Sequence, residues 1–323
     1  YDSDRALNPG TITQPIHRVK LDQDSVGVYG EQVFTTSNKV SYTVGARVQR
    51  VTTRSTDQFD ASAPGASGFD AQAAPGKNRD TEHGLKAGMR YPLDKQRSLY
   101  VSANRAFRIG SVDETFATFP GRFTFLEPQT SDNFEAGYRF DNQDTELQAG
   151  VYYMNLTNEI QFDPVTFSNI NLDPTRRYGA EISARYRIYN TLRLNLNLAL
   201  TTAKFRKGPN AGNEVPLVPE QSATLSALYQ FSQATRVTGT INYVGKRRFD
   251  NDQSNTFAKI PDYTTVDLKL GHETGPWKLS AQVNNLFDEQ YFEYGVRSTF
   301  TPGLYNAYPL PERNFLISIS RQF

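Results

Sequence analysis

The 323-residue sequence contains no cysteine, which excludes disulfide bonds, cysteine-ligated metal sites and thiol nucleophiles. It has no run of about 18 apolar residues, so it lacks a transmembrane helix. It also lacks an excess of either charge, because 35 lysines and arginines face 34 aspartates and glutamates. A balanced charge creates no field that attracts nucleic acid, and we expect no such partner.

What the sequence has instead is an abundance of aromatic residues. Phenylalanine, tyrosine and tryptophan make up 12% of the chain, although its mean hydropathy is only -0.59. Disordered chains share a low hydropathy but are poor in aromatic residues. The composition therefore indicates a folded chain that is polar on average.

The clearest pattern along the chain is the alternation of apolar and polar residues, which is typical of β-strands. Every second residue from Leu192 to Leu200 is leucine, and the residues between them are mostly polar. About thirteen segments fit this pattern, the first near Ile16–Thr35 and the last at Asn314–Phe323. No segment of ordinary helical length shows a 3.6-residue period. We therefore predict an all-β, antiparallel fold.

Short and long connections between these segments alternate without exception. Turn-like connections such as Asp141–Asp144 and Tyr189–Thr191 alternate with long ones such as Ile109–Ser131, Thr202–Val218 and Asp288–Pro311. In an antiparallel meander, alternate connections lie at the same end of the sheet. The sequence therefore predicts tight turns at one end and large loops at the other, as in outer-membrane β-barrels.

The polar strand faces favour a barrel with a wet interior. Glu181, Ser183 and Arg185 share a face that is too polar to pack between two sheets. A transmembrane barrel turns its apolar face to lipid and can keep a polar lumen. The alternative is a soluble β-sandwich or propeller with one solvated face in each sheet. That alternative explains neither the sorting of the loops nor the aromatic residues at the ends of apolar faces, such as Trp277.

Two motifs resemble those of TonB-dependent outer-membrane receptors. Val283–Tyr291 (VNNLFDEQY) resembles a motif late in the barrel of that family, and Glu312–Phe323 resembles its last strand. The alternating apolar residues before Phe323 resemble an outer-membrane assembly signal. Arg321 departs from this pattern, because an aromatic or apolar residue is usual there, and Gly110 stands where the family has proline. Through the order and spacing of such matches, the resemblance covers nearly the whole chain.

The resemblance implies that residues 1–323 are the C-terminal portion of a larger transmembrane β-barrel. Family barrels have about 22 strands and a plug domain before the barrel, and nothing in this sequence resembles a plug. Because an odd number of strands cannot close with every neighbour antiparallel, we expect the first and last strands not to pair. About nine strands and the plug are expected from an N-terminal segment that is absent from this chain.

The sequence contains no recognisable catalytic or metal-binding constellation, and no cofactor is expected. His17, His83 and His272 are the only histidines, and none has a partner at ligand spacing. No nucleophile elbow supports a Ser-His-Asp triad. Asp250–Gln253 lacks the acidic spacing of a calcium loop, so a solvated loop is the better interpretation. The sequence therefore predicts that the protein is not an enzyme.

The long loops carry the candidate ligand-binding residues, which are arginines and aromatic side chains. Aromatic rings give contact area at a low entropic cost, and arginine recognises anionic groups bidentately. The alternative for each ring is packing of loop against loop, or membership of an aromatic girdle at the membrane interface. The segment Val51–Asp80, rich in small and polar residues, is expected to remain a mobile loop. The candidate ligand-binding residues are Arg122, Phe123, Arg247, Arg248, Phe249, Tyr294, Arg297 and Tyr305.

Active uptake across the bacterial outer membrane is the function that the resemblance implies. A scarce ligand, such as an iron–siderophore or similar metal chelate, would bind the loops, and the TonB energy-coupling complex would act on the plug. The expected partners are therefore the N-terminal plug segment, the TonB complex, a metal chelate and the lipid bilayer. A passive porin-like channel is one alternative, and it would lack a plug. A surface adhesin or host-protein binder is another, and it would hold a macromolecule on the loop tips.

Overall fold

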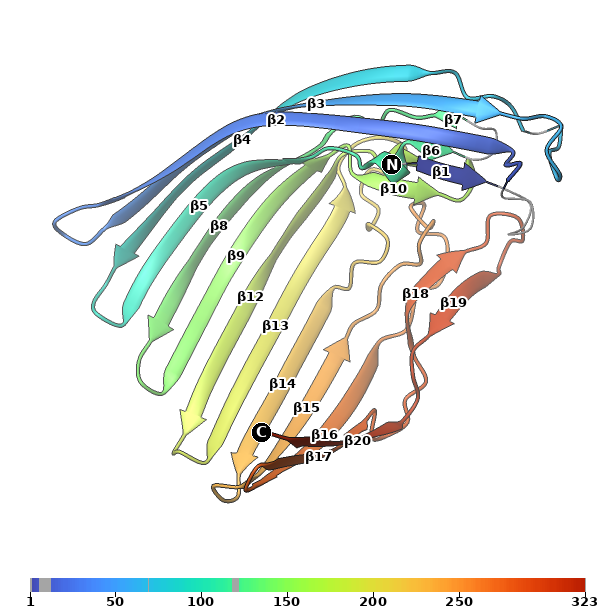
Figure 1. Cartoon of the computed structure of the whole chain (residues 1–323). Helices are drawn as coiled ribbons and strands as arrows, with labels where there is room; N and C mark the ends of the chain where they lie inside the picture. Colours follow the sequence, from blue (N-terminus) through green and yellow to red (C-terminus); the bar gives the residue numbers. More distant parts are fainter. Residues whose placement is uncertain (1, 6–12, 69, 118–121, 323) are drawn as a thin grey trace.

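The computed structural model describes residues 2–5, 13–68, 70–117 and 122–322, and most of them form one large curved antiparallel sheet (Figure 1). Within these residues the sheet has 14 strands. They are β1 (Asp2–Arg5), β2 (His17–Thr35), β3 (Ser41–Phe59), β4 (Gly76–Pro92), β5 (Arg97–Arg108), β8 (Gln129–Asp141), β9 (Thr145–Thr157), β12 (Thr175–Ile188), β13 (Leu192–Phe205), β14 (Gln221–Gln230), β15 (Thr235–Val244), β16 (Tyr263–Thr274), β17 (Trp277–Asn284) and β20 (Asn314–Arg321).

The remaining strands form small hairpins inside the long connections. They are β6 (Phe116–Ala117) with β7 (Arg122–Phe123), β10 (Ile160–Asp163) with β11 (Ser168–Asn171), and β18 (Phe292–Arg297) with β19 (Tyr305–Pro309). A three-residue 3-10 helix lies at Val112–Glu114. Among the described residues, no helix is long and apolar enough to cross a membrane.

The sheet follows the order of the chain, and each strand of the sheet pairs with the next one. Its two ends are β1 and β20, and these strands do not pair with each other over the residues that the structure describes. The expectation that the sheet does not close on itself is thus confirmed. The expected thirteen strands are also present, and the additional strand β1 is a short polar segment whose sequence shows no alternation.

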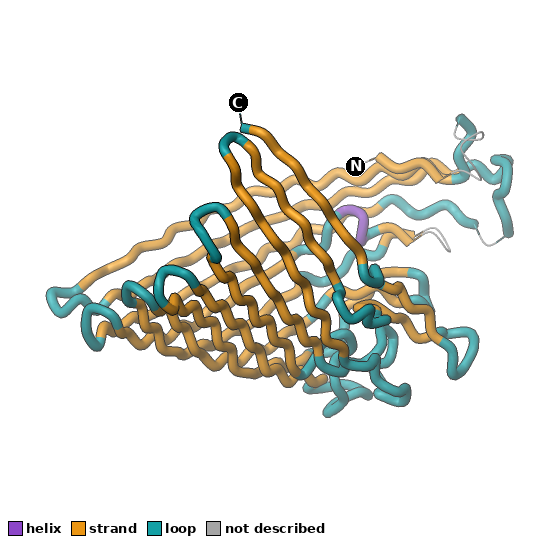
Figure 2. Tube along the Cα trace, turned by 90° about the horizontal axis from the view of Figure 1, so that it is seen from below, coloured by secondary structure: helices purple, strands orange, loops and turns teal. Residues whose placement is uncertain are grey.

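Tight and long connections lie at opposite ends of the sheet, as the sequence predicts (Figures 1 and 2). The tight-turn end has the connections 36–40, 93–96, 142–144, 189–191, 231–234 and 275–276. The long-loop end has the connections 60–75, 109–128, 158–174, 206–220, 245–262 and 285–313, which we call the loop collar.

The strand register gathers the alternating apolar residues onto one face of the sheet. Leu196 pairs with Ala184 on β12 and Leu225 on β14, and the same row continues through Ile241 and Val266. Exposed aromatic side chains lie at the tight-turn end of this apolar face. There the ring centroids of Tyr229 and Phe231 are 4.6 Å apart, and Trp277 lies at the start of β17. This arrangement is typical of a lipid-facing surface that is bordered by aromatic residues.

The prediction of a mobile loop over Val51–Asp80 is wrong. Strand β3 continues to Phe59 and β4 starts at Gly76, so only 60–75 lies between strands. Ala63 and Ala73 are buried, and the Asp57 carboxylate accepts hydrogen bonds from the Ala73 N–H and from the buried His17 ring at 3.0 and 2.9 Å. Small and polar residues can be buried here because the other loops of the collar cover this stretch. Composition alone does not reveal such coverage.

Candidate functional site in the loop collar

Phe249 is the centre of an aromatic cluster in the collar. Its side chain is buried, and its ring centroid lies 4.6 Å from Tyr305, 5.5 Å from Phe257 and 6.1 Å from Phe292. A Cβ atom added at Gly295 would come within 2.7 Å of the Phe249 ring, so only glycine fits there without a shift. Phe249 therefore joins connection 245–262 to the β18–β19 hairpin by packing.

Arg247 is buried and joins the same two segments by hydrogen bonds. Its guanidinium donates to the backbone carbonyl oxygens of Phe292 and Glu293, each at 2.9 Å, and lies over the ring of Tyr263. Burial lowers the pKa of Arg247. Because its donors are directed at backbone carbonyl oxygens, this side chain holds the two segments of the collar together.

Arg248 points to the neighbouring connection 206–220. It donates to the Glu214 carboxylate at 2.6 Å and to the Phe257 carbonyl oxygen at 2.9 Å, while Lys259 reaches Glu214 at 2.9 Å. Burial opposes the ionisation of Glu214, but the hydrogen bonds and charges of Lys259 and Arg248 outweigh it and lower its pKa. This charged group links two loops, and its charges are largely matched.

Asp250 connects three segments of the collar. Its carboxylate accepts hydrogen bonds from the Tyr294 hydroxyl at 2.6 Å and from Gln161 at 2.5 Å, and its backbone pairs with Gly295 and Arg297. Burial, together with the hydrogen bond to Asp250, raises the pKa of Tyr294. The segment around Asp250 is thus held by β10 on one side and by β18 on the other.

The interpretation of Asp250–Gln253 as a solvated loop is wrong for Asp252. This carboxylate is fully buried and accepts hydrogen bonds from the backbone N–H groups of Thr256 and Phe257. Arg297 approaches it at 3.5 Å and lies over the Phe257 ring. Among the described residues, no group of three or more histidine, aspartate or glutamate side chains is arranged to hold a metal ion.

Arg122 and Phe123 lie on β7, in a different part of the collar. Phe123 packs against Phe116, with ring centroids 5.4 Å apart, and Phe116 in turn contacts the ring of His17. Arg122 is exposed and donates to the Ser168 hydroxyl on β11 at 3.0 Å.

The β10–β11 hairpin joins these two parts of the collar, and the sequence analysis missed it. It contacts Arg122 through Ser168 and Asp250 through Gln161, and the ring of Phe167 stacks on Phe300 at 6.2 Å. A signal was available: Ile160 and Phe162 alternate with polar residues in β10, Ile170 and Leu172 do so from β11 onward, and an Asp-Pro pair at 163–164, typical of turns, ends β10.

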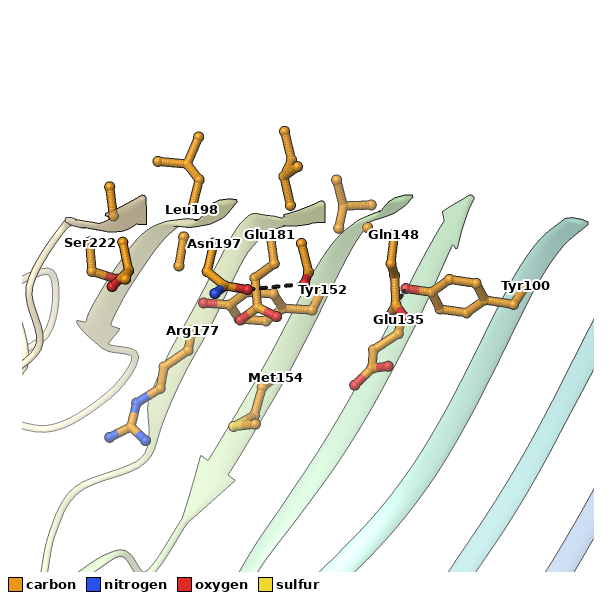
Figure 3. Close-up of a pocket in the computed structure, with 17 residues that line it drawn as sticks. Tyr100, Glu135, Gln148, Tyr152, Met154, Arg177, Glu181, Asn197, Leu198 and Ser222 are labelled. Atoms are coloured by element: carbon orange, nitrogen blue, oxygen red, sulfur yellow. Dashed lines mark hydrogen bonds between the residues drawn. The ribbon is translucent and has the colours of Figure 1, made fainter. Parts of the chain in front are cut away.

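The sheet face opposite the apolar one forms a polar wall beside the collar. Figure 3 shows Tyr100, Glu135, Tyr152 and Glu181 on this face and Leu198 on the other. The residues line a groove of about 510 Å³. Ion pairs cross the strands on the same face, among them Arg185 with Glu146 at 2.9 Å and Arg187 with Asp144 at 3.1 Å.

The structure thus separates the eight predicted site residues by their surroundings. Arg247 and Phe249 are buried inside the collar, and Phe123 and Arg248 are partly buried in contacts between loops. The remaining four keep surface that a ligand can contact, and they are Arg122, Tyr294, Arg297 and Tyr305.

Comparison with known proteins agrees with this architecture. A sequence model described as "TonB dependent receptor-like, beta-barrel" matches residues 1–286. The metal-pseudopaline receptor CntO of Pseudomonas aeruginosa (strain UCBPP-PA14) is 26% identical over 253 residues, which are 74% of this chain and 33% of the relative. The ferrioxamine receptor of Yersinia enterocolitica is 27% identical over 219 residues, 64% of this chain and 29% of the relative. The chain therefore spans about a third of the length of these relatives.

Solved structures show the same fold. The ferric yersiniabactin uptake receptor FyuA of Yersinia pestis superposes with a TM-score of 0.77 at 20% identity, over 95% of this chain and 47% of the receptor. The siderophore receptor PiuA of Acinetobacter baumannii also gives 0.77, at 19% identity, over 94% of this chain and 44% of the receptor. With the family match over residues 1–286, the chain belongs to the TonB-dependent receptor β-barrel family, whose members are outer-membrane transport receptors and not enzymes.

Proposed function

We propose that this chain is the C-terminal part of the barrel of a receptor that actively takes up a metal chelate, such as an iron–siderophore complex, through the outer membrane. The observation that carries the proposal is the packed collar, in which the β18–β19 hairpin places Arg297 directly opposite Tyr305 and leaves Tyr294 exposed on its other face. Rigid rings next to a guanidinium suit a ligand that is anionic and partly apolar.

The open sheet supports the proposal that further strands complete the barrel. In lipid, the edge of β2 beyond Lys20 and the edge of β20 would leave backbone donors and acceptors unsatisfied, at a cost of several kcal/mol for each group. An N-terminal segment that supplies the missing strands and a plug removes this cost. The TonB energy-coupling complex would then act through that plug.

The relatives support the choice of ligand class. Their names refer to metal-pseudopaline, ferrioxamine and ferric yersiniabactin, all of them metal chelates. We propose that Arg122, Tyr294, Arg297 and Tyr305 contact the chelate. In this proposal Phe123, Arg247, Arg248 and Phe249 hold the loops in place.

Uptake of 55Fe-loaded ferrioxamine and yersiniabactin, and of 65Zn-loaded pseudopaline, by iron-limited cells tests this function. We expect Arg297→Gln and Tyr305→Ala to raise the concentration for half-maximal uptake roughly tenfold, since each removes one strong contact of about 1.4 kcal/mol. Lys207→Gln, which changes an exposed collar residue outside the cluster, is the control and should behave as the unmodified receptor. Uptake that persists without TonB would instead support the passive porin.

Sidedness gives a second test, because the proposal requires the collar to face outward. Single cysteines introduced at Ser67 and Ser298 in the cysteine-free chain should react with a membrane-impermeant maleimide on intact cells. A cysteine at Asn142, in a tight turn, is the matched control and should react only after the outer membrane is permeabilised. Protection of both collar positions would contradict the proposed orientation.

A further inference from the structure

His17 is a fully buried histidine to which the proposed function gives no role. It is the first residue of β2, pairs with Phe59 on β3 and lies on the buried face of β2 with Val19 and Leu21. Its ring centroid is 5.1 Å from that of Phe59 and 5.8 Å from that of Phe116. Charging a side chain that is enclosed by aromatic rings and shielded from water is costly unless acidic groups face it.

Two buried carboxylates face this ring. Nδ1 of His17 lies 2.9 Å from Oδ2 of Asp57, and Nε2 lies 3.8 Å from Oδ1 of Asp70. Neither the ring nor the two carboxylates has exposed surface. Because an ionised carboxylate can only accept, Nδ1 carries a hydrogen and donates it to Asp57. Nε2 of His17 and Oδ1 of Asp57 have no hydrogen-bond partner within the part of the chain that the structure describes.

A proton on Nε2 reverses the contact between His17 and Asp70. Without this proton, the nitrogen turns a lone pair towards the carboxylate, and the contact is repulsive. With the proton, a cation lies between two carboxylates, at distances that favour the charged imidazole. Burial disfavours a charge on the ring, but it also penalises the Asp57 carboxylate when only neutral groups donate to it. We call His17, Asp57 and Asp70 the buried histidine group.

Charged side chains close in sequence to the buried histidine group or to Phe116 have partners of their own. They are Asp60 with Ser62 and Gln14, Glu114 with Arg108 at 2.8 Å, and Arg18 with Asp4 at 3.3 Å. Arg18 and Asp4 are exposed, so they lie on the other face of β2. The charge of His17 therefore acts mainly on Asp57 and Asp70.

The buried histidine group holds residues 70–73 against the sheet. The Asp57 carboxylate accepts a hydrogen bond from the Ala73 N–H at 3.0 Å, and the Asp57 carbonyl oxygen accepts one from the Gln72 side chain at 3.2 Å. Ala73 is itself buried. Both of these bonds end on Asp57, so the contact between His17 and Asp70 is a separate attachment of this segment.

The His17 ring also supports the part of the collar that carries Arg122. Phe116, which contacts the ring of His17, pairs across its hairpin with Phe123, the residue next to Arg122 on β7. The rings of Phe116 and Phe123 are 5.4 Å apart. A shift of the His17 ring is therefore passed by direct contact to the strand that presents Arg122.

We propose that the buried histidine group makes the attachment of these two collar loops dependent on pH. Protonated His17 holds residues 70–73 and Phe116 on the sheet, and loss of the proton from Nε2 loosens them. The attached state binds one proton more than the loosened state, so it is favoured as the pH falls through the range, roughly pH 5 to 8, in which histidines titrate. The inference requires no chelate, and a failure of the uptake proposal would leave it standing.

Hydrogen exchange of the full-length receptor, measured by mass spectrometry without any chelate, tests the proposal. The readout is the protection factor of a peptide that spans residues 70–75, which is the exchange rate relative to the unstructured peptide at the same pH. Between about pH 5.5 and about pH 8.5 we expect this protection to fall by up to about tenfold for each pH unit, because a difference of one bound proton permits no steeper change.

Two variants separate the buried histidine group from other causes of a pH response. His17→Gln keeps a donor for Asp57 but cannot become charged, so its protection should be low and independent of pH. Asp57→Asn removes the anion that pairs with the cation and should also abolish the pH response, which provides a second variant if His17→Gln does not fold. Heat-modifiable migration shows whether each variant is folded.

His272→Gln is the matched control. His272 shares a hydrogen bond of 2.9 Å with the Thr235 hydroxyl near a tight turn, at the opposite end of the sheet, so this variant should keep the full pH response. Protection of residues 70–75 that does not change with pH in the unmodified receptor would overturn the proposal. An undiminished pH response in folded His17→Gln would overturn it as well.

Discussion

Replacing Leu196 with arginine is expected to lower the free energy of unfolding of the barrel by about 2–4 kcal/mol. Leu196 lies in the middle of the leucine run on β13, between Ala184 and Leu225 on the apolar face. A guanidinium there would face hydrocarbon, and its nearest neighbours could not hydrogen-bond to it. Urea titration of the full-length receptor refolded into lipid vesicles measures the effect.

The adjacent residue provides the control for this prediction. Asn197 lies on the polar face and lines the groove together with Glu181. Asn197→Arg introduces the same side chain into a wet, partly acidic environment and should cost less than about 1 kcal/mol. Similar losses of stability for Leu196→Arg and Asn197→Arg would mean that the two faces are wrongly assigned.

Replacing Phe315, Ile317 and Ile319 together with asparagine is expected to reduce folded receptor in the outer membrane at least several-fold. These side chains are highly exposed on β20 and lie on the apolar face, opposite Val283, Ala281 and Leu279. Burying each in lipid contributes roughly 1.5–3 kcal/mol, so their loss removes the driving force for inserting this strand. Heat-modifiable receptor in outer-membrane fractions is the readout.

A triple replacement on the other face of β20 separates hydrophobic insertion from general damage. Leu316→Asn, Ser318→Asn, Ser320→Asn alters the other face of the same strand, which carries one leucine and two serines, and should leave receptor levels near normal. If both triple variants accumulate equally, the apolar face of β20 is not needed for insertion. Phe323, which the sequence analysis placed in the assembly signal, lies outside the described residues.

The departure at Arg321 has a structural explanation. Arg321 pairs with Trp277 across β17 and β20, and its guanidinium lies 5.4 Å from the centroid of the indole ring. Such cation–π contacts are favourable at the membrane interface, where the charged end remains hydrated. Arginine can therefore stand where an aromatic residue is usual in the family.

The membrane-spanning strands could be predicted from the sequence because lipid constrains every second residue. The leucines from 192 to 200 follow this rule, and β13 indeed begins at Leu192. The rule fails beyond the bilayer, where β13 continues to Phe205 and β3 to Phe59 beneath the collar. There, the strand faces contact loops of mixed composition, and alternation is lost.

The candidate site could be predicted only as a set of residue types. Sequence correctly located arginines and aromatic residues in the long loops but did not distinguish the buried Phe249 from the exposed Tyr305. The difference depends on contacts between distant segments, such as the hydrogen bond from Gln161 to Asp250, which are 89 residues apart. Local patterns carry no information about such contacts.

The tyrosines on the polar wall constrain how this surface can change. Tyr100 lies across its strand partner Gly137, where an added Cβ would be 2.5 Å from the phenol ring. The Tyr100 side chain also reaches Gly150, where an added Cβ would be 2.6 Å from its hydroxyl oxygen. Tyr152 lies over Gly179, and its hydroxyl shares a hydrogen bond of 2.8 Å with the Thr201 hydroxyl. At Gly137 and Gly179 an added Cβ would also collide with a backbone carbonyl oxygen, that of Ala149 or Leu200, so these two positions stay glycine even if the ring is lost. At Gly150 the nearest obstacle is the Tyr100 hydroxyl, so along an evolutionary lineage a larger residue at this position has to follow the replacement of Tyr100.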